Sequence, residues 1–148
     1  MMKFSPPADM KEGVHRLNVR VYFEDTDAGG IVYHANYLRF AERGRSEALR
    51  AMGVAHAAMM SEQGRMFVVR RANLDYQRPA RLDDELTIET RTKELGAARL
   101  VLAQAIKRGA ETLVEIELHL ACVDVVSARP VSLPAEMRLA LAWMMRSD

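Results

Sequence analysis

The sequence predicts an α+β fold in which one long helix packs against an antiparallel sheet of about five strands. Two observations predict it. The only long stretch with helical spacing of apolar residues spans 36–52, directly after a first strand-like segment. Four further strand-like stretches then follow one another without a helix between them. Strands that are consecutive in the chain pair antiparallel, so the helix must cover one face of the sheet that they form.

The first strand is expected at 17–23, where apolar and polar residues alternate. It ends abruptly at the polar segment 24–30, EDTDAGG, which places two carboxylates and a Gly-Gly pair between the strand and the next apolar residues. Such a composition predicts a turn.

The long helix has its apolar stripe on one side and charged residues on the other. Gly44 lies within the stripe, which indicates a close approach to a broad surface such as a sheet, because glycine otherwise weakens a helix. Gly53 is placed to end the helix. A shorter second helix is expected at 54–63.

The later strands are expected at 66–78, 85–95, 98–108 and 112–126, followed by a short C-terminal helix at 135–146. The apolar start of the first of them, 67–69, is out of step with the alternation that follows, which indicates a bulge or a change of face.

Length and composition point to one globular domain. The chain has 148 residues, of which 49% are hydrophobic and 28% charged. Residues 1–14 carry two prolines and several charges without periodicity, so they are expected to form a flexible N-terminal arm before a single domain at 15–148.

Several classes of function lack support in the sequence. The net charge of +1 does not favour nucleic-acid binding. Cys122 is the single cysteine, and the four histidines are scattered, so neither a disulfide nor a metal site is expected. The N-terminus does not resemble a secretory signal and no apolar run is long enough to span a bilayer, so a cytoplasmic protein without membrane insertion is expected.

The segment 22–50 carries the residues best suited to chemistry. Asp25, Asp27, the Gly-Gly pair, His34 and a helix start all lie within a few residues of one another. A helix start presents unpaired N–H groups and partial positive charge, which suits polarising a carbonyl. A carboxylate that faces that carbonyl can act as a nucleophile or as a general base.

Structural interpretations remain open for each of these residues. Asp25 and Asp27 can form an Asx turn, and a histidine before a helix can serve as a hydrogen-bonded structural residue. Asn36 can be an N-cap only, and Tyr33 can be a core or an interface aromatic only.

The run DTDAGGIVYHANYLRFAERGR resembles the signature of the 4-hydroxybenzoyl-CoA thioesterase family, and especially its bacterial branch of Tol-Pal system-associated acyl-CoA thioesterases. That branch carries D-T-D-x-x-G-x-V-Y-H-x-N-Y-L-x-F-x-E-x-x-R, and every fixed position is filled between Asp25 and Arg45. The segments FVVRRANLDYQRPARLDDELTIET and ACVDVVSARPVSLP also look like later parts of the family.

The resemblance implies a hot-dog fold, in which the sheet wraps the long helix, and a homodimer or homotetramer with active sites at subunit boundaries. It implies that Asp27 is the catalytic carboxylate, that the backbone N–H groups of His34 and Gly30 polarise the thioester carbonyl, and that the His34 side chain also takes part in catalysis. Tyr33, Asn36 and Arg129 are expected to bind substrate, with Arg129 on the CoA phosphates. Arg70, Arg71, Arg78 and Arg91 are further candidates for the phosphates.

The expected activity is hydrolysis of an acyl-CoA, or of an acyl-acyl carrier protein, to a free acid and a thiol without metal or cofactor. Met59, Met60 and Met66 are candidates for shaping the acyl site, and filling of the core explains the methionines equally well. The alternative is a non-catalytic protein of the cell envelope that binds acyl thioesters or acyl carrier protein. A hot-dog dehydratase is a third hypothesis, for which no H-F-P-G-type motif is present.

Overall fold

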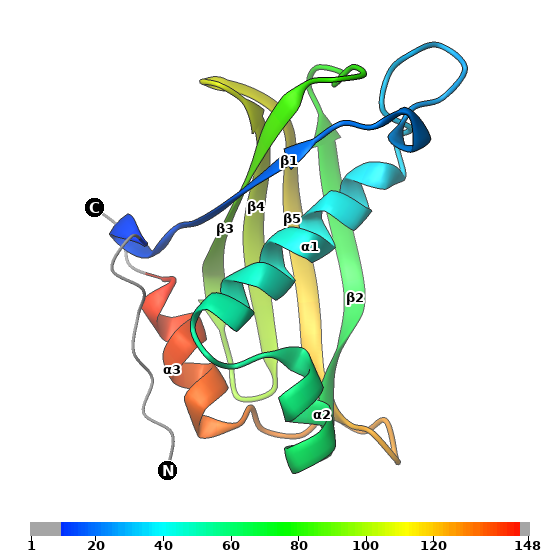
Figure 1. Ribbon diagram of the computed structural model, residues 1–148. Coiled ribbons are helices and arrows are strands. Elements are labelled where there is room, and N and C mark those ends of the chain that lie inside the picture. Colours follow the sequence, from blue (N-terminus) through cyan, green and yellow to red (C-terminus); the bar gives the residue numbers. More distant parts are fainter. Residues whose placement is uncertain (1–9, 146–148) are drawn as a thin grey trace.

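The computed structural model describes residues 10–145 and shows one five-stranded antiparallel sheet with the long helix α1 lying across one face (Figure 1). The strand order is β1-β3-β4-β5-β2. The strands are β1 (His15–Arg20), β2 (Arg65–Tyr76), β3 (Glu85–Leu95), β4 (Arg99–Arg108) and β5 (Glu111–Asp124), and the helices are α1 (Asn36–Ala51), α2 (His56–Gln63) and α3 (Ala135–Trp143). The predicted α+β class and hot-dog fold are therefore confirmed.

The order of strands follows from two hairpins. β3, β4 and β5 are joined by tight turns at residues 96–98 and 109–110, and Gly109 has a φ of 60° that favours glycine. β1 then pairs with β3, and β2 pairs with β5, which leaves β1 and β2 as the two edges. The predicted bulge in β2 is confirmed by a register shift between Val69 and Arg71.

Gly44 brings α1 onto the sheet. A Cβ atom at this position would overlap Cγ2 of Ile88 on β3. One helical turn earlier, Phe40 is fully buried in the core. A polar contact lies in the same interface, where the Gln104 side chain on β4 donates a hydrogen bond to the carbonyl of Ala41 at 2.8 Å. The close approach that Gly44 indicated is confirmed.

The first strand ends earlier than its alternation predicted. β1 stops at Arg20, and residues Phe23–Asp25 form a 3-10 turn in which Phe23 is 81% exposed. The physical reason is the Asp25 carboxylate, which accepts a hydrogen bond from the Tyr22 N–H at 2.8 Å and so turns the chain away from the sheet.

The predicted N-terminal arm overlaps the described residues at 10–14. There Met10 and Val14 are buried, and Met10 belongs to the main hydrophobic core. Apolar side chains in a short segment are sufficient to dock it, although it shows no periodicity. Residues 1–9 lie outside the described part of the chain, and the domain at 15–148 stays a prediction.

Candidate active site

Asp25 ties the loop before α1 to the helix itself. Its side chain is 7% exposed, and its Oδ1 accepts a hydrogen bond from the Asn36 side-chain amide at 2.9 Å while Oδ2 accepts from the Tyr22 N–H. The backbone carbonyl of Asp25 also accepts from the Tyr33 N–H at 3.0 Å. Three hydrogen bonds to one residue fix the loop against the first turn of α1, which agrees with a structural role for Asp25.

Asp27 lies on a tight turn that holds its side chain out of the core. The turn is closed by hydrogen bonds from the Asp27 N–H to the Ile31 carbonyl at 2.9 Å and from the Gly30 N–H to the Asp27 carbonyl at 3.1 Å. Gly30 has a φ of 79°, which explains a glycine there. Oδ1 of Asp27 accepts from the Gly29 N–H at 2.8 Å, as in an Asx turn, and no described residue donates to Oδ2. The exposed carboxylate thus keeps one oxygen available to a substrate or a water.

His34 lies immediately before α1 and is exposed. Its backbone N–H donates to no acceptor among residues 10–145. The carbonyl of the same residue accepts a hydrogen bond from the Tyr76 hydroxyl at 3.0 Å. An unengaged N–H at the positive end of a helix is suited to receive a carbonyl oxygen.

The rings of Tyr33 and His34 lie beside each other. Their ring centroids are 4.6 Å apart, and Tyr33 is half-exposed. Asn36 and Gly30, by contrast, already make hydrogen bonds inside the protein through the groups expected to meet substrate. Asp27, Tyr33 and His34 are therefore accessible groups of the same segment, whereas Asn36 lies among the bonds that shape the loop.

Arg129 lies beyond the opposite end of β2. The Asp124 N–H donates to its carbonyl at 2.9 Å, and Asp124 pairs with Arg65 at the start of β2. His34 contacts Tyr76 at the other end of that strand. Eleven residue steps at about 3.3 Å each separate these ends by about 35 Å. Arg129 and Asp27 therefore do not meet within one chain.

A small apolar hollow of about 170 Å³ lies between α2 and the beginning of β2. Its lining contains the three methionines expected to shape the acyl site, together with two aromatic rings: His56, Met59, Met60, Met66 and Phe67. The rings of His56 and Phe67 meet edge to face at 5.8 Å between centroids. Burial lowers the pKa of His56 below its usual value, and the Arg45 guanidinium lowers it further.

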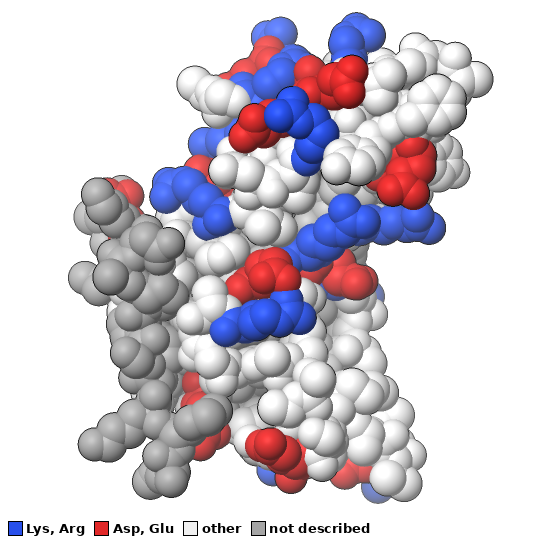
Figure 2. All heavy atoms as spheres, in the orientation of Figure 1, with Lys and Arg blue, Asp and Glu red and all other residues white. Residues whose placement is uncertain are grey.

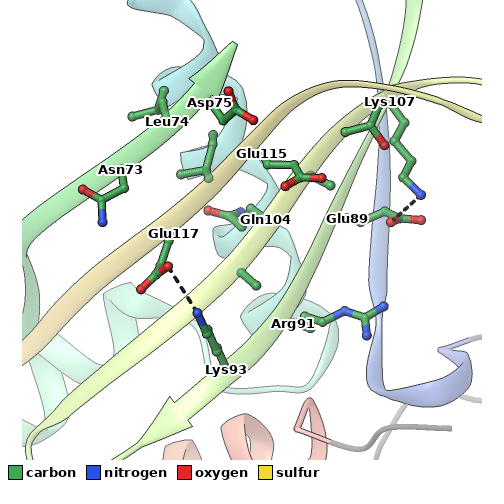
Figure 3. A pocket seen from close by; sticks show the side chains of 14 residues that line it. Asn73, Leu74, Asp75, Glu89, Arg91, Lys93, Gln104, Lys107, Glu115 and Glu117 are labelled. Atoms are coloured by element: carbon green, nitrogen blue, oxygen red, sulfur yellow. Dashed lines mark hydrogen bonds and ion pairs between the residues drawn. The ribbon is translucent and has the colours of Figure 1, made fainter. Parts of the chain in front are cut away.

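A larger hollow of about 560 Å³ lies on the other face of the sheet, away from α1 (Figure 3). Its walls carry charged side chains, and ion pairs cross it from Lys93 to Glu117 at 3.2 Å and from Lys107 to Glu89 at 3.3 Å. None of the predicted site residues except Arg91, a minor candidate, lines it. The hollow is a paired polar surface and does not belong to the candidate site.

The surface on the α1 side carries basic and acidic side chains interspersed, without an extended area of one sign (Figure 2). Among residues 10–145, no group of three or more His, Cys, Asp or Glu side chains is placed to hold a metal ion. Nor does any helix in this part of the chain have the length and apolar character to cross a membrane. Cys122 is buried, and burial raises the pKa of its thiol.

Two contributions to the site were not anticipated from the sequence. One is the hydrogen bond from Tyr76 to His34, which joins residues 42 positions apart. The other is the tight packing of the Tyr76 ring against Tyr37, with centroids 5.7 Å apart. Alternation placed Tyr76 on a strand, but nothing in the local spacing indicated that this strand ends beside the loop.

Comparison with known proteins now identifies the family. The model of the thioesterase superfamily matches residues 29–115, which is more than half of the chain. The chain belongs to the thioesterase superfamily. The matched region begins in the Asp27 turn, at Gly29, and contains all of α1 and β2.

Relatives within the thioesterase superfamily are similar over most of the chain. An acyl-CoA thioesterase YbgC of Haemophilus influenzae is 43% identical over 82% of this chain and 90% of its own length. An acyl-CoA thioester hydrolase YbgC of Escherichia coli is 44% identical over 84% of this chain and 93% of its own length. The solved structure of a probable thioesterase from Bartonella henselae is 41% identical, covers 82% of this chain and 99% of that chain, and superposes with a TM-score of 0.78.

Proposed function

We propose that the protein hydrolyses acyl-CoA thioesters to a free carboxylic acid and CoA, with Asp27 as the reacting carboxylate. The observation that carries the proposal is that one short segment holds two groups able to bind or attack a substrate. These are the exposed Asp27 carboxylate on its fixed turn and the unengaged His34 N–H at the start of α1. The relatives named as acyl-CoA thioesterases support the substrate class.

Two routes fit this arrangement. In the first, a carboxylate oxygen of Asp27 attacks the thioester carbon, the C–S bond breaks, and CoA leaves as a thiolate that takes a proton; water then hydrolyses the mixed anhydride. In the second, Asp27 accepts a proton from a water that attacks the same carbon; the C–S bond then breaks, and CoA leaves as a thiolate that takes that proton. In both, the His34 N–H stabilises the negative charge that develops on the carbonyl oxygen. In this proposal the exposed His34 side chain acts as an acid or base, and as an acid in the first route it donates the proton that the departing thiolate takes.

Gly30 and Asn36 take different parts in this proposal. The Gly30 N–H is held in the Asp27 turn, so polarisation rests on His34 first. Asn36 acts by holding Asp25, and through it the loop. Tyr33, half-exposed beside His34, is available to contact substrate.

Pairing of two chains along β2 would complete the site. β2 is a twelve-residue edge strand whose outer side has no strand beside it among residues 10–145. Antiparallel pairing with a second copy places the Arg65 end of one β2 beside the Tyr76 end of the other. The methionine-lined hollow and Arg129 of one chain then approach Asp27 of its partner, which favours a homodimer or a homotetramer built from it.

The proposed branch of the family, the localisation and the carrier of the acyl group rest on the sequence motif. We propose that the protein is a cytoplasmic enzyme of the Tol-Pal system-associated branch, which the resemblance of the D-T-D to E-x-x-R pattern supports. Its carrier is CoA or acyl carrier protein, and Arg129 is a candidate for binding the nucleotide phosphates of CoA.

The test is release of free thiol from a panel of acyl-CoAs, from short aliphatic to long-chain and aromatic, by wild type and by Asp27→Asn. Wild type is expected to release thiol, and Asp27→Asn to lose about 10²–10⁴-fold in kcat. Glu24→Gln, which neutralises another exposed carboxylate of the same loop, is the control and is expected to retain activity.

Other outcomes decide between the hypotheses. Equal release by wild type and Asp27→Asn would make Asp27 a turn residue. No release by either would favour the acyl-thioester binding protein, and formation of an enoyl product from a 3-hydroxyacyl-CoA would favour the dehydratase.

A further inference from the structure

Tyr76 connects the edge strand β2 to the loop that precedes α1. Its hydroxyl donates a hydrogen bond to the His34 carbonyl at 3.0 Å, although the two residues are 42 positions apart in the sequence. Tyr76 is the last residue of β2, so a rigid element of the sheet supports the first turn of the helix.

The hydrogen bond from Tyr76 holds the peptide unit that follows the His34 Cα atom, because the His34 carbonyl belongs to that unit. A peptide unit is planar, so fixing its carbonyl fixes the direction of the whole unit. The unit on the other side of His34 is fixed in the same manner, because the Tyr33 carbonyl accepts a hydrogen bond from the Asn36 N–H at 2.8 Å. With both flanking units held, the His34 N–H keeps one direction.

The Tyr76 ring is itself held in place. It packs against the buried Tyr37 with 5.7 Å between centroids and meets the His34 ring edge-on at 6.5 Å. The Tyr37 hydroxyl in turn accepts a hydrogen bond from the Ala80 N–H at 3.0 Å. Three successive contacts therefore run from the chain after β2 to the backbone of His34.

We propose that Tyr76 is a positioning residue for the thioester carbonyl, which it serves by fixing the backbone of His34 through the hydroxyl-to-carbonyl hydrogen bond. This inference rests on the proposed thioesterase function. The Tyr76 hydroxyl bonds to the protein and makes no contact with the substrate in this proposal. It therefore affects stabilisation of the transition state, through the His34 N–H, more than it affects substrate binding. A group of this kind lowers kcat when it is lost and leaves KM unchanged.

The test compares Tyr76→Phe with wild type on the acyl-CoA that wild type hydrolyses with the highest kcat/KM. Tyr76→Phe is expected to lower kcat about ten-fold, the change that loss of one neutral hydrogen bond produces. KM should stay within about two-fold, as an interaction specific to the transition state requires. Thr87→Val is the matched control, because it removes another hydroxyl hydrogen bond of 3.0 Å, from Thr87 to Asn18 on the edge of the sheet; its kcat should equal that of wild type.

A second readout separates positioning from a general loss of structure. The same acyl-CoA, labelled with ¹³C at the thioester carbonyl, is bound to Asp27→Asn, and its carbonyl stretching frequency is measured by infrared spectroscopy. Binding is expected to lower the frequency relative to the free substrate. Adding Tyr76→Phe should return it part of the way toward the free value. Replacement of Tyr76 by 3-fluorotyrosine keeps the ring and the hydroxyl, so its kcat should match wild type.

Two results would overturn the positioning role: an unchanged kcat in Tyr76→Phe, or a lower kcat with an unchanged carbonyl frequency. Both leave wild-type hydrolysis in place, so the thioesterase function would stand. Failure of wild type to release thiol from any acyl-CoA would instead defeat the proposed function, and the role of Tyr76 with it.

Discussion

The side-chain amide of Asn36 donates a hydrogen bond to the Asp25 carboxylate at 2.9 Å, and both side chains are buried. The contact joins the turn that carries Asp27 to the first residue of α1. Because the Asp25 carboxylate also accepts from the Tyr22 N–H, and the Asp25 backbone carbonyl accepts from the Tyr33 N–H, this one residue organises the loop from both sides.

Asn36→Ala is expected to destabilise the protein by about 1–3 kcal/mol, since it leaves a buried carboxylate oxygen without its donor. Urea unfolding of the variant and wild type measures the change. Asn73→Ala, at an exposed asparagine of β2, is the control and should differ from wild type by less than about 0.5 kcal/mol. Equal midpoints for Asn36→Ala and wild type would show that the contact contributes little.

Gly44→Ala is expected to destabilise the fold by about 1–3 kcal/mol, although alanine is the better helix former. The added methyl would overlap Ile88 on β3, so α1 must move away from the sheet. Thermal unfolding checks this, with Ser46→Ala on the same helix as the control. A higher Tm for Gly44→Ala would mean that helix propensity outweighs the close approach.

The pKa of His56 predicts how stability changes with pH. Burial and the nearby Arg45 lower the pKa of His56 in the folded state, so the unfolded chain binds the proton more readily. The free energy of unfolding is therefore highest above pH 6.5, about the pKa of histidine in the unfolded chain. It decreases as the pH falls from there toward the lower pKa of His56 in the folded state. Free energies of unfolding at pH 7.5, 6.5 and 5.5 should show this decrease.

His56→Gln removes the titrating group and is expected to flatten that part of the profile. The same decrease in His56→Gln as in wild type would assign the pH dependence to other residues.

Met60→Trp is expected to narrow the hollow of about 170 Å³ and so to change acyl preference. A cavity of about 150 Å³ accommodates a benzene ring, so the wild-type hollow suits a short aliphatic or a single-ring acyl group. With a larger side chain at position 60, kcat/KM should fall for six-carbon and aromatic acyl-CoAs and be retained for acetyl-CoA.

Met145→Trp, at an exposed methionine after α3, is the control and should keep the wild-type ranking of substrates. The same ranking in Met60→Trp as in wild type would remove the hollow from the acyl site.

Periodic features of the fold could be predicted because each of them depends on neighbours along the chain. The stripe of α1, the alternation in β3 to β5 and the placement of Gly44 all report which face a residue turns to the core. The end of β1 at Arg20 was missed, because the alternation continues to Phe23 while the Asp25 carboxylate redirects the backbone. Hydrogen bonding by one side chain overrode the pattern.

The candidate site could be predicted where the motif is contiguous and not where it depends on contacts distant in sequence. Asp27 and His34 lie on one short segment, and the structure presents both as accessible. The hydrogen bond from Tyr76 joins two separate elements and leaves no periodic trace in the sequence. Asn36 was expected to meet substrate, yet its buried bond to Asp25 could be seen only once the loop was folded.

In the proposed dimer, the separation of about 35 Å between the two ends of β2 gives each chain two half-sites, one at each end of the strand. Mixed dimers should expose this division. A chain with Asp27→Asn and a chain with Arg129→Ala each carry one damaged half, and their heterodimer would combine both lesions in one site and leave the other site whole. Recovery of activity after the two impaired proteins are mixed would then show that residues of two neighbouring chains form one active site.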